Sequence, residues 1–164
     1  FCGLPSKDKD IFPLAVINNI LGGSMSSKLF QTIREEKGLA YSVYSYSASY
    51  KGCGLYTIYA GLNPDKVDLV CELIINEVQK LVKDGISDYE LKKGKEQLKG
   101  NYILSLESIS SRMSALGKSE VMGERCRTPE EVLALIDSVD EEYANRIIKN
   151  IFDAPSCTAI VSPK

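Results

Sequence analysis

Residues 21–43 of this chain read LGGSMSSKLFQTIREEKGLAYSV, and the fold can be built outward from them. The pair Gly22-Gly23 would stop a preceding helix, and either Ser26 or Ser27 can cap a new one. Gly38 stands where a C-terminal glycine would end that second helix. The apolar side chains expected on its buried face are Leu29, Phe30 and Ile33. The stretch therefore predicts a helix end, a short second helix, a turn and the start of a strand.

The neighbouring segments extend this pattern on both sides. Apolar residues recur at helical spacing over residues 8–21 and predict a helix there. Over residues 41–50 the period changes to alternation, with tyrosines on one side and serines mostly on the other, which is typical of a strand. Residues 51–54 have turn composition, and residues 55–62 read as the returning strand of a β-hairpin.

The remainder of the chain is expected to be mainly helical. Asn63-Pro64-Asp65 combines an N-cap, a proline at the first helical position and an acidic first turn, and the helix that it opens should end at Gly85. Capping boxes at residues 87–90 and 128–131 predict two more helix starts. The first of these begins a helical region that runs to about residue 124, with a break near residues 107–108.

The last elements complete the predicted architecture. Asp140 should cap a final helix ending near Phe152, and residues 157–162 are expected to form a buried closing strand. This order of elements predicts an α+β fold with two layers, in which helices cover one face of a mixed β-sheet. Because 164 residues with 44% apolar side chains suffice for one core, residues 1–164 are expected to form a single domain.

Composition and charge exclude several classes of function. The net charge of -2 is spread along the chain, so neither nucleic acid nor an anionic membrane is expected as a partner. No apolar run reaches the roughly 18 to 20 residues that a membrane-spanning helix needs. The chain has no histidine, which excludes Ser-His-Asp and Cys-His catalysis and the histidine-based zinc helices. No glycine motif of the phosphate-binding type lies between a strand and a helix.

The cysteines offer no metal site in the sequence. There are five, widely scattered and without a C-x-x-C pair, and they are best interpreted as buried free thiols in a reducing compartment. They are Cys2, Cys53, Cys71, Cys126 and Cys157. No cofactor and no metal are therefore expected in this chain.

Residues 21–43 closely resemble the signature of the second, non-zinc half of the pitrilysin and mitochondrial processing peptidase type of zinc metallopeptidases. The resemblance continues through the hairpin at residues 52–61, the helix after Asn63-Pro64, and residues 87–100 and 137–139. It covers nearly the whole chain. It implies that this chain is the C-terminal half of a two-half peptidase, and that the missing N-terminal half binds zinc on an H-x-x-E-H helix.

The family resemblance also implies a site. An arginine and a tyrosine of the second half reach across a closed chamber toward the substrate, and Arg34 and Tyr41 match them. Since Arg34 ends a predicted helix and Tyr41 begins a strand, the turn at Gly38 should bring both side chains to one rim of the sheet. There they could stabilise negative charge on a peptide carbonyl. The alternative is an arginine that complements the helix dipole and a tyrosine that packs in the core.

Two functions remain open from the sequence. In the first, the chain binds peptide and assists the transition state in a zinc metalloendopeptidase, with the isolated chain inactive. In the second, it belongs to a non-catalytic structural or regulatory subunit, like processing-peptidase subunits or respiratory-complex core proteins of this family. The implied partners are the upstream zinc-binding half, a peptide, and a second subunit in a homodimer or heterodimer. A bacterial cytoplasmic location is favoured over the mitochondrial matrix.

Overall fold

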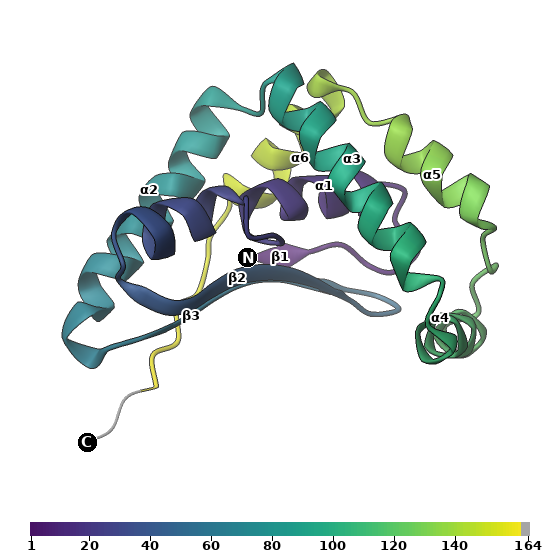
Figure 1. The fold of residues 1–164 in the computed structure, drawn as a ribbon, viewed down its shortest axis with the longest axis horizontal. Helices are drawn as coiled ribbons and strands as arrows, with labels where there is room; N and C mark the ends of the chain where they lie inside the picture. The colour runs from purple at the N-terminus through teal and green to yellow at the C-terminus, as the bar shows by residue number, and fades with distance from the viewer. Residues whose placement is uncertain (162–164) are drawn as a thin grey trace.

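The computed structural model describes residues 1–161 of the 164. Eleven elements occur in these residues, and most begin or end at the capping residues that the sequence indicates (Figure 1). In chain order they are β1 (Cys2–Gly3), α1 (Ile11–Leu21), the π-helical segment η1 (Phe30–Glu36), β2 (Ala40–Ser49), β3 (Gly54–Leu62), the 3₁₀ turn η2 (Pro64–Lys66), α2 (Val67–Asp84), α3 (Asp88–Ser105), α4 (Ile109–Met122), α5 (Pro129–Asp137) and α6 (Glu141–Phe152).

The three strands form one antiparallel sheet in the order β1-β3-β2. The predicted hairpin is confirmed: β2 and β3 pair along their length, and the Tyr50 N–H donates to the Cys53 carbonyl at 2.8 Å to close the turn. One register shift, between Ala40 and Ser42, interrupts the ladder. The helices lie over one face of this sheet, and α4 lies beyond its end (Figure 1). The α+β class with helices on one face is thus confirmed, and every strand pairing within residues 1–161 is antiparallel, where a mixed sheet was expected.

The helix caps follow the sequence closely. Both predicted capping boxes form, with Ser87 accepting from the Glu90 N–H and Thr128 accepting from the Glu131 N–H. Asp140 caps α6. The helical region is interrupted between α3 and α4, near residue 107, as expected. Such caps satisfy backbone N–H groups that have no partner inside the helix. The described helices include none that is long and apolar enough to cross a membrane.

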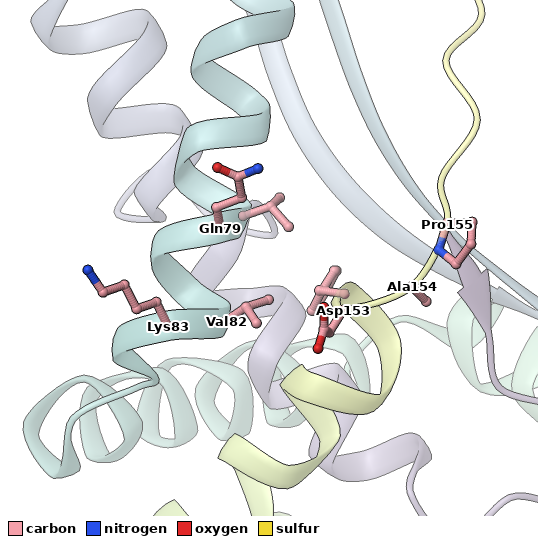
Figure 2. A pocket seen from close by; sticks show the side chains of 8 residues that line it. Gln79, Val82, Lys83, Asp153, Ala154 and Pro155 are labelled. Carbon is pink, nitrogen blue, oxygen red and sulfur yellow. The ribbon is translucent and has the colours of Figure 1, made fainter.

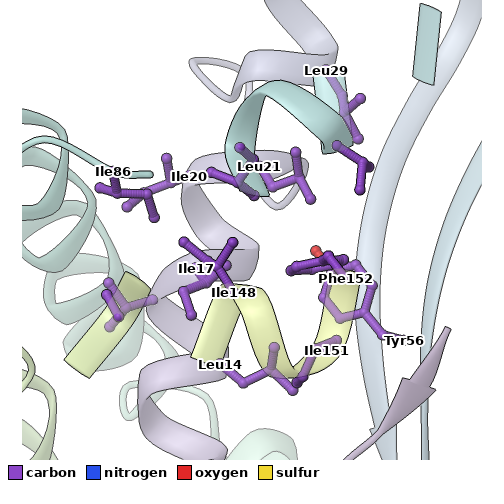
Figure 3. Packing of buried hydrophobic residues seen from close by; sticks show 14 of the residues in the cluster. Leu14, Ile17, Ile20, Leu21, Leu29, Tyr56, Ile86, Ile148, Ile151 and Phe152 are labelled. Carbon is purple, nitrogen blue, oxygen red and sulfur yellow. The ribbon is translucent and has the colours of Figure 1, made fainter. Parts of the chain in front are cut away.

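The core lies between the sheet and the helices α1, α2 and α6 (Figure 3). Its centre contains one polar chain of hydrogen bonds. The buried Tyr56 hydroxyl donates to Ser45 Oγ at 2.9 Å, which donates to Asn18 Oδ1 at 2.7 Å. Burial raises the pKa of Tyr56 far above its ordinary value, so this phenol stays neutral. The chain of bonds joins both strands of the hairpin to α1.

Gly22 brings the end of α1 against β2. Its carbonyl accepts from the Ser45 N–H at 3.0 Å, and a Cβ atom at this position would lie 2.5 Å from Ser45 Oγ. A side chain would therefore push α1 away from the sheet. The glycine that ends the helix, as the sequence predicts, also allows this close approach.

The predicted closing strand does not form. Residues 157–161 have no regular secondary structure and are exposed, Val161 fully so, while Ser162 lies outside the described residues. The strand pairings of the described residues join only β1, β3 and β2, so residues 157–161 belong to no hydrogen-bonded ladder. Apolar composition alone therefore predicted a strand whose partner is missing from residues 1–161.

Candidate functional site

Arg34 lies in the last turn of η1, as predicted. Leu29 and Ile33 are completely buried beneath this segment and fix its orientation, whereas Phe30 is only partly buried. Gly38 has a φ of +59°, which reverses the chain and lets its N–H donate to the Arg34 carbonyl at 3.1 Å. The turn therefore points the Arg34 side chain to the rim of the sheet where β2 begins.

The serines before η1 behave differently from the prediction. Neither Ser26 nor Ser27 caps the helix: the Ser27 hydroxyl is buried without a hydrogen-bond partner, and the Ser26 hydroxyl donates to Gln97 on α3. A tight turn precedes the helix, in which the Ser27 N–H donates to the Ser24 carbonyl at 3.1 Å. This turn directs the serine hydroxyls away from the first free N–H groups of the helix.

Tyr41 occupies the register shift at the start of β2. Ala40 pairs with Leu62 and Ser42 pairs with Gly61, which leaves Tyr41 as an extra residue with no partner on β3. A bulge of this kind turns a side chain away from the pleat. The Tyr41 side chain is 86% exposed, so the alternative interpretation of a core tyrosine is wrong.

Arg34 and Tyr41 lie next to each other in the folded chain. The guanidinium carbon of Arg34 is 5.9 Å from the centre of the Tyr41 ring and 4.9 Å from the centre of the Phe30 ring. These distances are within the range of cation–π attraction, which would limit the motion of an otherwise exposed side chain. Glu35 Oε1 lies 4.0 Å from Arg34 Nε, beyond hydrogen-bond distance, so this carboxylate does not occupy the guanidinium N–H groups. The Arg34 guanidinium and the Tyr41 ring are therefore exposed side by side at this rim.

A shallow hollow of about 530 Å³ adjoins Tyr41. It is lined by residues of the Gly38 turn, the start of β2 and the end of β3, including Tyr59 and Gly61. Sequence reasoning did not single out Tyr59 as a site residue. The alternation along the returning strand shows that Tyr59 lies on the opposite side from its two neighbours. It does not show which side faces outward, because that depends on which side the helices cover.

A second hollow of about 460 Å³ lies between α2 and the end of α6 (Figure 2). Its lining combines apolar side chains such as Val78 and Val82 with polar ones, of which Lys83 and Asp153 are charged. Neither Arg34 nor Tyr41 lines it. With one cation and one carboxylate, it offers no group of side chains suited to catalysis.

The described residues do not fit a metal ion. Between residues 1 and 161, no three histidine, cysteine, aspartate or glutamate side chains come together as a ligand set. The cysteines are free as predicted, but Cys71 alone is partly buried and the other four are exposed, so the expectation of buried thiols is wrong for those four. Four of them lie in loops, strand ends or the irregular tail, where no core forms around the side chain.

One ion pair fastens the segment before η1 to α3. The Lys28 ammonium contacts Glu90 Oε1, while Glu90 Oε2 accepts from the Ser87 N–H at 3.0 Å in the capping box. Partial burial raises the pKa of Glu90, but the hydrogen bonds from Lys28 and Ser87 outweigh it and the pKa is lowered from 4.5. The ionised carboxylate is therefore the form that the fold stabilises.

The lowered pKa of Glu90 predicts how the stability of the folded chain depends on pH. The contribution of Glu90 should be fully present above its unfolded pKa of about 4.5 and lost as the pH falls through the lower folded pKa. At about pH 7 we expect Glu90→Gln to unfold at a lower urea concentration than the unmodified chain. The difference between the two urea midpoints should become smaller at about pH 3. Glu72→Gln, at an exposed position on α2, is the matched control. A difference in urea midpoint that does not change with pH would contradict a stabilising role for the ionised Glu90 carboxylate.

Comparison with known proteins places this arrangement in a family. The model of the family described as "Peptidase M16 inactive domain" matches residues 1–98, the segment that includes Arg34, Tyr41 and the whole sheet. The chain is similar to the uncharacterized zinc protease YmxG of Bacillus subtilis, with 43% identity over 99% of this chain. It spans only 40% of the length of that relative.

Solved structures have the same fold. A peptidase M16 inactive domain from Pseudomonas fluorescens superposes on 91% of this chain with a TM-score of 0.80, at 22% identity and over 36% of its own chain. A chain of complex III from Candida albicans covers 91% with a TM-score of 0.77, at 18% identity and over 38% of its own chain. The chain belongs to the M16 peptidase family and corresponds to its inactive domain. The resemblance to the non-zinc half is thereby confirmed.

Proposed function

We propose that this chain is the second half of a zinc metalloendopeptidase and that it binds the peptide and stabilises the transition state. The observation that carries the proposal is the pairing of Arg34 and Tyr41, exposed side by side at the rim of the sheet. The relative length of the match supports a longer parent protein, since YmxG has more than half its length outside the matched region. Residues 1–164 would form one domain of that parent.

The chemistry follows from the two donors. When a nucleophile attacks a peptide carbonyl carbon, the carbonyl oxygen gains negative charge. The Arg34 guanidinium and the Tyr41 hydroxyl would donate hydrogen bonds to that oxygen and stabilise the charge. The buried anchor of η1 and the bulge in β2 support this role, because they place the backbone of both residues at the same rim of the sheet. Such preorganised donors stabilise the transition state more than the ground state.

Zinc would be held by the other half of the parent, because no ligand set exists within residues 1–161 of this chain. We expect the isolated chain to retain far less than one zinc per chain after dialysis. Elemental analysis of the refolded, dialysed chain measures this directly, with zinc added in excess beforehand. Stoichiometric zinc that survives dialysis would contradict the assignment of the metal to the other half.

The other half is the first partner we propose. The described part of α4 buries none of its side chains, and Ile109, Met113 and Leu116 are exposed at the spacing of one helix face. An apolar helix face of this kind is usually covered in the working protein. This surface lies beyond the end of the sheet (Figure 1), so a partner could cover it without blocking Arg34.

A second function is supported by the similarity of fold to a chain of complex III. In that case the chain would be part of a non-catalytic subunit, and Arg34 and Tyr41 would have no substrate. The two functions differ in one measurement, cleavage of a quenched fluorescent peptide by the intact parent protein. We expect chelator-sensitive cleavage. A folded, zinc-loaded parent that cleaves no unstructured peptide would instead favour the scaffold function.

A further inference from the structure

The outward face of the hairpin has no charged side chain within the described strands. The pairing of Tyr44 with Tyr59 and of Tyr46 with Thr57 places these four side chains on the same side of the sheet. The opposite side contains the buried Val43, Ser45 and Tyr56. We call the outward surface the tyrosine face. Its members are Ser42, Tyr44, Tyr46, Ala48, Leu55, Thr57, Tyr59 and Gly61.

The tyrosine rings form a preformed platform. The Tyr44 and Tyr59 rings stack with centres 5.0 Å apart and planes 30° apart, and Tyr46 continues the row at 6.2 Å from Tyr44. Each of the three side chains is between 44% and 47% exposed. Half of each ring is thus held by its neighbours and half is available to a ligand. Tyrosines arranged in this way supply apolar contact area at low entropic cost, and their hydroxyls can meet polar backbone groups.

The platform is continuous with the proposed catalytic surface. Tyr59 lines the hollow next to Tyr41 and also stacks on Tyr44. An extended peptide advances about 3.3 Å per residue, and Tyr44 is three residues from Tyr41 along β2. A peptide whose carbonyl lies at Arg34 and Tyr41 would therefore place side chains roughly two to four residues away on the tyrosine face.

We infer that the tyrosine face selects extended peptides with aromatic or large apolar side chains at those positions, against peptides with acidic ones. This inference rests on the proposed peptidase function. An apolar side chain gains by leaving water on such a surface. A carboxylate would lose hydration without a cation to receive it, since the charged Arg34 lies only at the end of the face. The tyrosine face therefore favours apolar side chains of the peptide over anionic ones.

The test uses the intact parent and matched quenched peptides that differ at one position, with phenylalanine or glutamate two to four residues from the cleaved bond. The parent should cleave the best phenylalanine peptide with a kcat/KM about 10-fold or more above its glutamate counterpart. The double variant Tyr44→Ser/Tyr46→Ser should lose this preference through a higher KM for the phenylalanine peptide. Tyr89→Ser, at a position on α3 that is 76% exposed, is the control and should retain the preference.

Each other outcome has a defined meaning. If the double variant folds and keeps the preference, or if the parent prefers glutamate, the inference is overturned while the peptidase function stands. If the double variant does not fold, Tyr46→Ser alone is used, and it should reduce the preference. If the parent cleaves nothing, anisotropy with labelled peptides decides: tighter binding of the phenylalanine peptide, lost in the variant, supports the inference.

Discussion

Tyr41→Phe in the intact parent protein should lower kcat for peptide cleavage by about 10²- to 10³-fold, the usual effect of removing one preorganised donor. The ring would remain to contact Arg34, and only the hydroxyl would be lost. Because Tyr41 is 86% exposed and makes no described hydrogen bond within the chain, stability should change little. The measurement is steady-state kinetics together with zinc content and thermal unfolding of the same samples.

Arg34→Ala should have a similar effect on kcat, with a further loss of order in Tyr41 because the cation–π contact disappears. Arg34→Lys is the informative companion, since it keeps the charge but removes the planar set of donors. We expect it to recover only part of the activity. If both Tyr41→Phe and Arg34→Ala cleave at the parental rate and merely unfold earlier, the transition-state role is refuted and the residues are structural.

The second large effect concerns the core. Phe152→Ala should destabilise the chain by about 3 to 5 kcal/mol, the usual range for removal of a buried aromatic ring. Phe152 is 5% exposed and meets the Tyr56 ring edge-on, with ring centres 4.9 Å apart (Figure 3). The centre of the Phe1 ring lies 5.3 Å from that of Phe152. Removal of the ring would take away the aromatic contacts that join α6 to the sheet.

Urea unfolding of the chain followed by far-ultraviolet circular dichroism tests this value. Tyr89→Ala is the matched control, an aromatic residue on α3 that is 76% exposed, and should change the free energy of unfolding by less than about 0.5 kcal/mol. Equal destabilisation by the two substitutions would mean that the α6–sheet contact is not part of the cooperative core.

Local sequence features predicted most of the secondary structure. Ser87, Thr128 and Asp140 cap helices as expected, because a cap depends on hydrogen bonds between residues only two or three positions apart. Asn63 caps the 3₁₀ turn η2 that leads into α2, whereas α2 itself begins after Lys66 without a side-chain cap. The hairpin followed from alternation and turn composition for the same reason. The prediction of a closing strand failed because a strand is defined by its hydrogen-bonded partner, and residues 157–161 pair with none of the described strands.

The site was only partly within reach of the sequence. The family motif selected Arg34 and Tyr41, and their convergence at the rim of the sheet was expected from the Gly38 turn. The bulge that turns Tyr41 outward was not, since it arises from the pairing of Ala40 and Ser42 with consecutive residues of β3. The role of these two residues in catalysis stays a prediction until the substitutions are measured.

By itself, the sequence determined where most of the helices start and stop, which residues alternate in the hairpin, and that no histidine chemistry is present. Tertiary structure alone decided which side of that alternation faces water. Tyr56 and Tyr59 are three residues apart on one strand, yet Tyr56 is buried and Tyr59 is half exposed. The difference arises because α1, α2 and α6 pack on only one face of the sheet. The spacing of residues within one strand does not predict which face distant segments will cover.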